Sequence, residues 1–360
     1  MKIFQLIQKP QARGAELFAD LLSDQLQKQG HEVFLVSVFE GDFKLSFSGT
    51  QVHLKRSLKN RLWDWKGWKD FSELVKKEQP DIIQANAGDT LKFAVMSKAF
   101  FGWKAPIVFR NASLVSRYIQ NPIVKSYNSW LYSLVGGIVS VSEESQKDFN
   151  SVFSPKNKLH RAIPIGIPIS EHSPKLVKSS DPILVHIGGF TFEKNHLGLL
   201  KIFREVLKSQ PAVKLWLFGD GPLLAEVLNQ IRLTGLEGNV IWKGVQSDPF
   251  SLIPETAILI LPSIIEGLPS VILEAFAARI PVIAFGVGGI PEVVKSGETG
   301  WLVQVGESAA FGQAILECLS LPDQARNKLT DSAKELVEEK YQICRIAEEF
   351  EGFYRELLNP

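Results

Sequence analysis

Two glutamates separated by seven residues lie in the segment that carries the most chemical information. Glu266 lies in a short loop after the apolar run Ala257–Leu261, and Glu274 follows in a predicted helix that runs to about Arg279. Pro269 suits the first turn of that helix, because its missing N–H would have no partner there. Free N–H groups at a helix start attract phosphate, and carboxylates accept hydrogen bonds from sugar or ribose hydroxyls. The pattern favours a binding site for such groups, although both acids can also simply complement the helix dipole.

Two more loops after apolar runs contain residues suited to binding. Lys194 stands in the loop Gly188–His196, which follows the run Ile183–Ile187. The turn Gly219–Gly221 follows the run Val213–Phe218. In open α/β sheets, ligands lie beyond the carboxyl ends of the strands. Each feature is weak by itself, because loop lysines are usually solvated charges and glycine turns end strands in many folds.

Short β-branched runs alternate with longer helical patterns along the whole chain. Most runs are continuous rather than alternating, which indicates strands buried on both faces of a parallel sheet that helices cover. The alternation of strand and helix occurs twice and predicts an α/β fold with two doubly wound, Rossmann-like domains. The predicted strands are Lys2–Ile7, Glu32–Val38, Ile82–Gln84, Ile107–Phe109 and Gly137–Val141, then Ile183–Ile187, Val213–Phe218, Val240–Trp242, Ala257–Leu261 and Val282–Ala284.

The domain boundary is predicted within residues 164–182. Prolines and small polar residues there prevent a helix or a central strand. We expect residues 1–168 to form an N-terminal domain and residues 169–340 a C-terminal domain. Apolar residues at near-helical spacing predict a final amphipathic helix, whose part from about 341 to 360 packs back on the N-terminal domain. These residues are Leu336, Tyr341, Ile343, Ile346, Phe350 and Tyr354.

The net charge of +1 hides an uneven distribution of charge. Residues 1–170 carry 23 Lys and Arg against 15 Asp and Glu, whereas residues 171–360 carry 17 against 24. A basic first half suggests an anionic partner. Basic residues mixed with tryptophan over residues 53–69 suit an anionic membrane surface or a lipid-linked acceptor, and a solvated loop before a helix fits them equally well. These residues are Lys55, Arg56, Lys59, Arg61, Lys66 and Lys69 with Trp63, Trp65 and Trp68.

The remaining bulk features point to the cytoplasm. No run of about 18 uncharged apolar residues occurs, so no transmembrane helix is predicted. The first ten residues are too short and too polar a stretch for a signal peptide and read better as a buried strand. The two cysteines offer neither a disulfide framework nor metal-ligand spacing, which fits a reducing compartment. We expect a cytoplasmic protein that is either free or peripheral on the inner face of the membrane.

The pair Glu266 and Glu274, with Gly-x-Pro directly after the first acid, resembles the signature of the retaining family 4 glycosyltransferases (glycosyl transferases group 1). That family has the GT-B fold, in which two Rossmann-like domains face a central cleft. Other segments resemble the family in the same order, strongly over residues 183–303 and loosely over residues 1–165. They are Arg13–Glu16, Val139–Glu143, Ile163–Ile167, Gly188–His196, Phe218–Pro222, Pro281–Ala284, Gly288–Glu292 and Gly297–Gly300.

The resemblance implies roles for individual residues. Glu274 is expected to accept hydrogen bonds from the ribose of the donor, and Glu266 to lie by the transferred sugar. Lys194 is expected to neutralise the diphosphate, whose charge grows as the sugar leaves. Gly14 is expected to let the backbone approach the phosphates, because it has no Cβ. Further donor-side residues are Arg13, Gly189, Gly219, Lys243, Gly267, Leu268, Pro269 and Ser270.

The chain departs from the family pattern at three places. The family usually has an arginine at the position of Gly189, so one phosphate-binding cation is missing, and Arg13 or Lys243 is the candidate substitute. Gln84–Asn86 and Arg110–Ser113 stand where the family often has histidines. Arg279 replaces a common glycine, so we expect a different C-terminal cap on the signature helix.

Polar residues after the predicted strand Ile107–Phe109 are the acceptor-side candidates. We expect Arg110, Asn111 and Ser113 to face the cleft and to contact the acceptor or a phosphate. Capping of the next helix is an equally good interpretation. Two histidines flank the loop that contains Lys194. His186 is expected in the core and His196 at a helix start.

The resemblance therefore implies an enzyme that moves a hexosyl-type sugar, with retention, from a UDP or GDP sugar to a glycan or lipid-linked acceptor. Cell-envelope polysaccharide or glycolipid synthesis is the expected setting. No Asp-x-Asp follows a strand, so neither a metal nor another cofactor is expected. The alternative is a catalytically retired nucleotide-sugar-binding or scaffold protein. A dehydrogenase is disfavoured because no Gly-x-Gly-x-x-Gly follows the first strand of either half, and no nucleic-acid reading module is present.

Overall fold

The computed structural model describes residues 1–360 except 62, 156–157, 170–181 and 360. The chain divides into two compact units, one of Met1–Pro168 with Gln342–Pro360 and the other of Ile169–Tyr341. Each unit has the Rossmann-like α/β layering that the continuous apolar runs predict. Most of the predicted boundary stretch, residues 170–181, lies outside the described residues.

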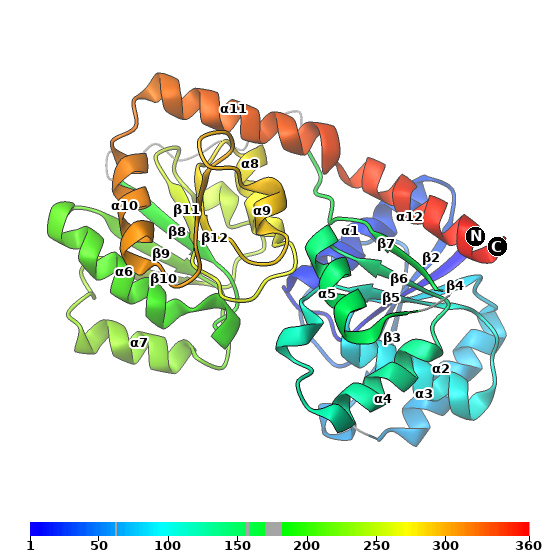
Figure 1. Cartoon of the computed structure of the whole chain (residues 1–360). Helices are drawn as coiled ribbons and strands as arrows, with labels where there is room; N and C mark the ends of the chain where they lie inside the picture. The colour runs from blue at the N-terminus through cyan, green and yellow to red at the C-terminus, as the bar shows by residue number, and fades with distance from the viewer. Residues whose placement is uncertain (62, 156–157, 170–181, 360) are drawn as a thin grey trace. The chain divides into compact units, whose positions relative to one another are not determined.

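Unit 1 is built on a parallel sheet whose strand order is β3-β2-β1-β4-β5-β6-β7 in the part of the chain that the structure describes (Figure 1). The central strands are mostly apolar and almost wholly buried, because helices cover both faces of the sheet. The strands are β1 Lys2–Ile7, β2 Glu32–Phe39, β3 Thr50–Arg56, β4 Ile82–Ala85, β5 Ile107–Asn111, β6 Gly137–Ser140 and β7 Leu159–Ala162.

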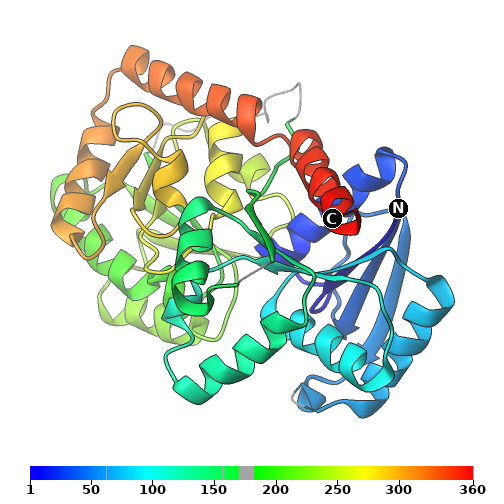
Figure 2. The same ribbon diagram turned by 45° about the vertical axis from the view of Figure 1, so that its right-hand side comes forward.

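The helices of unit 1 divide between the two faces of this sheet. Strand order reverses between β1 and β4, and right-handed crossovers in opposite directions place their helices on opposite faces. One face carries α1, against which the last helix of the chain, α12, packs. The other face carries α2 and α3, with α4 beside α3 (Figure 2). The helices are α1 Gly14–Lys28, α2 Trp65–Glu78, α3 Gly88–Phe101, α4 Pro122–Ser133, α5 Glu143–Phe153 and α12 Ile343–Leu358.

Unit 2 has a second parallel sheet with the order β10-β9-β8-β11-β12-β13 among the described residues. Helices α6, α7 and α10 pack together, and α8 packs with α11. The strands are β8 Ile183–Ile187, β9 Lys214–Phe218, β10 Val240–Gly244, β11 Ile258–Leu261, β12 Val282–Phe285 and β13 Trp301–Val303. The helices are α6 His196–Ser209, α7 Leu224–Leu233, α8 Ser270–Ala277, α9 Ile290–Val293, α10 Ser308–Leu319 and α11 Asp323–Lys340.

The C-terminal segment is not one helix, as its apolar spacing predicted, but two. α11 ends at Lys340 in unit 2, and α12 begins at Ile343 in unit 1. The N–H of Ile343 donates to the carbonyl of Ile167 over 3.0 Å, so the break lies beside the end of the first unit's N-terminal chain. No helix of the described chain has the length and apolar character that a membrane crossing requires.

Candidate active site

The carboxyl ends of β8 and β11 lie where the strand order of the second sheet reverses. β8 leads to α6 and β11 leads to α8, and the two crossovers run in opposite directions. Their loops therefore diverge to opposite faces of the sheet and leave a crevice at the strand ends. Both loops contain residues that the sequence singles out, Lys194 after β8 and Glu266 after β11.

Three hydrogen bonds join these two loops. The N–H of Ile264 donates to the carbonyl of Glu193 over 2.8 Å. The Asn195 Nδ2 donates to the carbonyl of Pro262 over 3.1 Å. The Lys194 Nζ donates to the Glu266 Oε1 over 2.5 Å. The structure thus brings together two predicted site residues that lie 72 positions apart in the sequence.

The ion pair of Lys194 and Glu266 is partly shielded from water. The Lys194 side chain is 21% exposed and that of Glu266 is 9% exposed. A charge at this depth needs a partner, because removing one member leaves the other poorly solvated. Lys194 keeps access to solvent, so an anionic ligand can compete for its ammonium group.

The start of α8 is held by a glycine of a neighbouring loop. Pro269 is the N-cap residue, one position before the first turn that its lack of an N–H predicted. The N–H of Gly289 donates to the carbonyl of Gly267 over 2.5 Å. Gly288 has φ +54°, and a Cβ there would overlap the carbonyl oxygen of Glu266. This close approach fixes the backbone that carries Glu266 into the crevice.

Glu274 lies one helical turn after Ser270 in α8. Burial raises the pKa of Glu274, a hydrogen bond from the Ser270 side chain opposes that rise, and the charge of Asp248 adds to it. A partly buried carboxylate with one short-range donor still has capacity to accept further hydrogen bonds. A hydroxyl-bearing ligand suits that capacity better than a second anion does.

The turn after β9 packs directly on the loop after β8. Gly219 has φ +125°, and a Cβ there would overlap the carbonyl oxygen of Gly188. The N–H of Phe190 donates to the carbonyl of Asp220 over 2.9 Å. Gly219 is therefore placed by the loop that contains Gly189, and only a residue without a side chain allows the two backbones to approach this closely.

The remaining predicted donor-side residues, Lys243, Arg13 and Gly14, lie outside these loops. Lys243, in β10, lies with its Nζ 4.0 Å from the ring centroid of Trp216. Arg13 is the exposed N-cap residue of α1 in unit 1, and Gly14 is the first residue of that helix. A Cβ added to Gly14 would have no described heavy atom within 4 Å. Whether Arg13 or Lys243 replaces the missing arginine stays a prediction.

Two of the three acceptor-side candidates do not follow the strand, as predicted, because β5 continues through Arg110 and Asn111, whereas Ser113 does follow it. Both side chains are buried. The Arg110 guanidinium lies 4.2 Å from the ring centroid of Phe18. Burial lowers the pKa of Arg110 to about 10, against the opposing charge of Glu16. The Asn111 Nδ2 donates to Ser140 Oγ over 3.3 Å.

Because Arg110 and Asn111 are buried, Ser113, which is half-buried, is the most accessible of the three acceptor-side candidates. Polar residues stand at the neighbouring strand end too, but they bind one another. The Asn86 Nδ2 donates to the Gln5 Oε1 over 3.0 Å, and the Gln84 Nε2 donates to the Asn86 Oδ1 over 3.0 Å.

Comparisons with known proteins match both units. A model described as Glycosyltransferase Family 4 matches residues 12–171, and a model described as Glycosyl transferases group 1 matches residues 169–336. The chain is a glycosyltransferase of this group 1 and family 4 type. The Rossmann-like units and their sheets are those of the GT-B glycosyltransferases.

Individual relatives differ in how much of the chain they share. The N-acetyl-alpha-D-glucosaminyl L-malate synthase of Bacillus anthracis is 31% identical over 51% of this chain and 47% of its own length. The alpha-monoglucosyldiacylglycerol synthase of Streptococcus pneumoniae is 25% identical over 92% of this chain and 81% of its own length. This glycosyltransferase therefore spans about half the length of the first relative and most of the second.

A solved structure of similar fold covers the whole chain. The crystal structure of Anabaena HepE with UDP-glucose has a TM-score of 0.83 and 20% identity, and it covers 100% of this chain and 99% of the other. At this identity the likeness shows the fold alone.

Sequence reasoning did not anticipate how Asn195 joins the two loops of this glycosyltransferase. Asn195 has φ +55° and bonds Pro262 directly before α6 begins. A signal was present, since asparagine is the residue other than glycine that most readily adopts a left-handed conformation.

Two histidines under the loops have the packing roles that the sequence favours. His196 opens α6, and its ring stacks on Phe190 with centroids 4.0 Å apart. His186 is buried in β8, and its Nδ1 lies 2.9 Å from the Ile260 carbonyl, so Nδ1 carries the proton in the neutral ring. Burial lowers the pKa of His186 to about 4 and that of His196 to about 2. Both rings are therefore neutral at physiological pH and do not add charge beside Lys194.

The expectation of a different cap after α8 is wrong. Arg279 has φ +58°, the left-handed conformation that a glycine would adopt there. Its N–H donates to the Phe276 carbonyl, and the N–H of Ile280 donates to the Ala275 carbonyl over 2.8 Å, which is the usual glycine-type ending. An ion pair between Arg279 and Asp331 of α11 accompanies this conformation.

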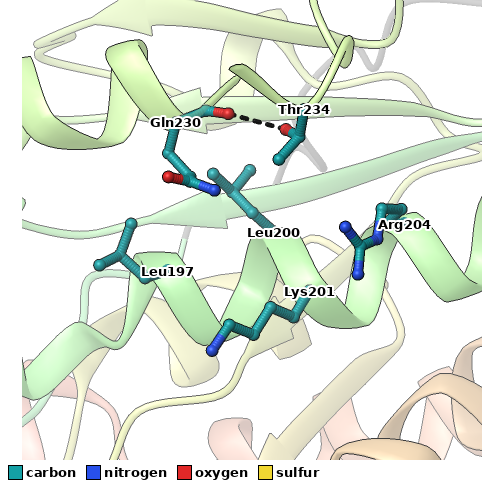
Figure 3. Close-up of a pocket in the computed structure, with 6 residues that line it drawn as sticks. All are labelled: Leu197, Leu200, Lys201, Arg204, Gln230 and Thr234. Carbon is teal, nitrogen blue, oxygen red and sulfur yellow. Dashed lines mark hydrogen bonds between the residues drawn. The ribbon is translucent and has the colours of Figure 1, made fainter. Parts of the chain in front are cut away.

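A separate groove of about 370 Å³ lies between α6 and α7 and contains none of the predicted site residues (Figure 3). The groove is lined by Leu197, Leu200, Lys201, Arg204, Gln230 and Thr234.

Within the described chain, no cluster of three or more His, Cys, Asp and Glu side chains is arranged to hold a metal ion. Independence from metal stays a prediction that rests on the resemblance.

Proposed function

We propose that this glycosyltransferase transfers a hexosyl-type sugar, with retention, from a UDP or GDP sugar to a glycan or lipid-linked acceptor. The observation that carries the proposal is the direct pairing of Lys194 with Glu266 at the strand-order reversal, next to the Glu274 helix. A cation, a helix start with free N–H donors and a carboxylate at one crevice match the parts of a sugar diphosphate.

The residues of unit 2 have separate tasks in the proposed reaction. Glu274 accepts hydrogen bonds from the ribose, and the Gly267–Ser270 backbone lies along the diphosphate and sugar. Lys194 exchanges its bond to Glu266 for one to the diphosphate, which releases the Glu266 carboxylate to accept a sugar hydroxyl. After the exchange Lys194 is paired with the diphosphate and Glu266 is hydrogen-bonded to a hydroxyl, so neither charge is left without a polar partner.

The proposed bond changes need no protein nucleophile. The acceptor hydroxyl oxygen bonds to the anomeric carbon on the face from which the diphosphate leaves, and the bond from that carbon to the diphosphate oxygen breaks. The hydroxyl proton passes to the leaving diphosphate. Lys194 stabilises the negative charge that accumulates on the diphosphate as this bond breaks. No metal is required in this scheme.

We assign the acceptor to unit 1, with Ser113 as the accessible candidate among the three predicted residues. The basic balance of that half favours an anionic or lipid-linked glycan. The names of two relatives refer to a glucosaminyl malate and to a glucosylated diacylglycerol, which are an anionic compound and a lipid. We place the reaction in the cytoplasm, where nucleotide sugars are the expected donors.

A retired nucleotide-sugar-binding protein is the second candidate, favoured by Gly189 in place of the usual arginine. Turnover separates the two functions. The protein is incubated with UDP and GDP sugars and with glycan and lipid acceptors, and release of UDP or GDP is measured. Acceptor-dependent release, with the product anomer of the donor's configuration by NMR, supports transfer. Binding of the nucleotide sugar without transfer of its sugar to any acceptor or to water supports the retired protein.

Loss of divalent ions gives an independent check on the metal-free scheme. Turnover after dialysis against EDTA is expected to equal turnover before it, because Lys194 supplies the neutralising charge. Activity that disappears with EDTA and returns with Mg²⁺ or Mn²⁺ would contradict the scheme.

A further inference from the structure

Phe192, in the loop after β8, is the most exposed phenylalanine of the chain. It is 70% exposed, and of the 23 phenylalanines only Phe100 is also exposed, at 44%. The ring of Phe100 stacks on Trp68 with centroids 5.4 Å apart, whereas no described aromatic ring packs against Phe192. Because burial of an apolar ring away from water is favourable, a ligand that covers Phe192 gains affinity from it.

The loop that carries Phe192 is held in place by its backbone. Phe190, two residues earlier, is fully buried, and its N–H donates to the Asp220 carbonyl over 2.9 Å. Phe192 opens a short 3₁₀ turn that ends at Lys194, and its carbonyl accepts from the N–H of Asn195 over 3.2 Å. The exposed ring therefore stands on a backbone that is already ordered, so little backbone freedom is lost when a ligand covers the ring.

Phe192 lies next to the ion pair of the candidate active site. Lys194 is two residues further along the same turn. The carbonyl of Glu193, between them, accepts from the N–H of Ile264 over 2.8 Å, and Ile264 is two residues before Glu266. The backbone of Phe192 is thus close to both members of the ion pair. Its ring is exposed at the part of the crevice where Lys194 and Glu266 meet.

The surroundings of Phe192 indicate which chemistry suits its ring. The chain neighbours Thr191 and Glu193 are polar and half-buried, so the ring is not part of the continuous apolar groove that a lipid chain requires. A sugar ring has apolar C–H groups on its face and hydroxyls at its edge. Its face can cover an aromatic ring while its hydroxyls stay bound to polar groups or to water.

The order of groups in a sugar nucleotide favours a sugar ring over a nucleobase at this place. In the proposed reaction Lys194 binds the diphosphate, Glu266 the sugar and Glu274 the ribose. The base is attached beyond the ribose, so it is the group furthest from the bond between sugar and diphosphate. Phe192 is close to Lys194 and Glu266, and it therefore lies at the sugar end of the ligand.

We infer that Phe192 stacks against the apolar face of a sugar ring and holds that ring beside Lys194 and Glu266. This inference rests on the proposed function. Two rings present the required chemistry, the sugar of the donor and the terminal sugar of a glycan acceptor. In the second case Phe192 selects a glycan over a lipid that lacks a sugar. Phe192 takes no part in the bond changes, so its substitution affects binding and not the bond-making step.

Calorimetric titration tests the donor as the source of the ring. UDP and GDP hexoses, and UDP and GDP alone, are titrated into wild type, Phe192→Leu and Phe192→Tyr. Leucine keeps an apolar side chain without a flat face, whereas tyrosine keeps the aromatic face. If the ring belongs to the donor, Phe192→Leu binds the nucleotide hexose about three- to tenfold more weakly and Phe192→Tyr binds it like wild type. All three proteins should bind UDP or GDP alone equally, which shows that the Lys194 loop is intact.

Saturation-transfer NMR tests a glycan acceptor as the source. Methyl hexosides are titrated into protein that is saturated with UDP or GDP, so that the nucleotide position is filled without a sugar. If the ring belongs to the acceptor, Phe192→Leu binds methyl hexosides about three- to tenfold more weakly than wild type and binds nucleotide hexoses equally. Phe192→Tyr should again match wild type.

Leu233→Ala is the matched control for the loss of an exposed apolar side chain. Leu233 is 73% exposed at the C-terminal end of α7 in the same unit. We expect this variant to bind every probe like wild type. Thermal unfolding should be the same for all variants, because both positions are exposed.

Three results would overturn the inference. One is an unchanged affinity of Phe192→Leu in both titrations while UDP or GDP still binds, and the proposed function would then stand without Phe192. Another is an equal loss of affinity for UDP or GDP alone, since the ring would then cover the base or shape the phosphate loop. The third is a wild type that binds neither nucleotides nor nucleotide hexoses, which would overturn the proposed function and this inference together.

Discussion

Lys194 and Glu266 each stabilise the charge of the other. Each is shielded enough that the other's removal leaves a poorly solvated charge. Glu274, by contrast, has a hydroxyl donor but no cation in its immediate surroundings that lowers its pKa. The first pair is therefore suited to exchange with an anionic group and the second carboxylate to bind neutral hydroxyls.

Replacement of Glu274 by glutamine is expected to weaken nucleotide binding and to leave or raise stability. The raised pKa means that ionisation of Glu274 opposes folding, so its contribution to stability falls as pH rises above the ordinary value of 4.5. Glutamine removes this cost at neutral pH. The loss of a charged acceptor for the ribose costs about 1.5–3 kcal/mol, or about ten- to a hundredfold in affinity.

Calorimetric titration and thermal unfolding at pH 7 measure both effects of Glu274→Gln. A lower melting temperature with unchanged nucleotide affinity would show that Glu274 is structural. The same measurements at pH 5 should reduce the difference in stability between the two proteins, because wild-type Glu274 is then partly protonated.

Introduction of an arginine at Gly189 is expected to tighten nucleotide binding. A Cβ there would lie 3.7 Å from the Asp220 carbonyl oxygen and 3.8 Å from Thr191 Cγ2, which are ordinary contacts. The side chain therefore fits, and it restores a cation beside the proposed diphosphate position. We expect a gain of about tenfold, the size of one charged hydrogen bond. Gly189→Gln is the neutral control, and an equal effect of both variants would argue against a phosphate at this loop.

Residue-level contacts were only partly accessible from the sequence. The spacing of Glu266 and Glu274 marks the segment, but it does not reveal that Glu266 meets Lys194 or that Glu274 bonds Ser270. The Lys194–Glu266 contact depends on the reversal of strand order, which brings distant loops together, and the Glu274–Ser270 contact depends on where α8 begins. Arg110 and Asn111 show the opposite error, because a strand extended by two residues changes accessible side chains into buried ones.

At the level of elements, the central strands follow from their continuous apolar runs, whereas three strands do not. β3 and β7 form the edges of the first sheet and β13 an edge of the second. β3 alternates exposed and half-buried residues, since helices do not cover both its faces. These three edge strands lack the continuous apolar run that identifies buried ones, whereas β10, the other edge of the second sheet, contains the run Val240–Trp242 and was predicted.

The cap of α8 gives a prediction about backbone strain. Arg279 holds a left-handed conformation that costs about 1 kcal/mol for residues other than glycine. Arg279→Gly is expected to leave stability unchanged or to raise it by up to about 1 kcal/mol, because the lost ion pair with Asp331 is exposed and weak. Arg279→Val should lower it by about 1–2 kcal/mol.

Urea unfolding of the Arg279 variants measures these differences. Asp331→Ala is the control that reports the ion pair alone. A glycine variant clearly less stable than Asp331→Ala would contradict the strain, since the ion pair could not then explain the loss.

For the whole molecule, the chain leaves unit 1, builds unit 2 and returns to unit 1 in α12. The apolar spacing predicts a helix at the C-terminus. The same spacing continues through Tyr341, so it does not show that α11 ends there and α12 begins after it. The break becomes evident only from packing, because Ile346, Phe350 and Tyr354 are buried in unit 1.

Tyr354 connects the end of the chain to the centre of the first sheet. Its hydroxyl donates to the Gln84 Oε1 over 2.6 Å and accepts from the Gln5 Nε2 over 3.3 Å. Tyr354→Phe leaves both buried amides without this partner and is expected to destabilise the protein by about 1–3 kcal/mol. Tyr127→Phe on exposed α4 is the matched control in thermal unfolding. Equal melting temperatures for the two variants would show that the hydrogen bonds of Tyr354 to Gln84 and Gln5 do not stabilise the protein.

Calorimetric titration with UDP, GDP and their sugars most directly tests whether the loops after β8 and β11 hold a sugar nucleotide. Wild type is compared with Lys194→Ala and with Lys201→Ala, which removes an exposed lysine of the adjoining helix α6. We expect one nucleotide to bind wild type and Lys201→Ala equally and to bind Lys194→Ala at least about tenfold more weakly. Equal affinity of all three proteins, or no binding by wild type, would contradict the proposed site.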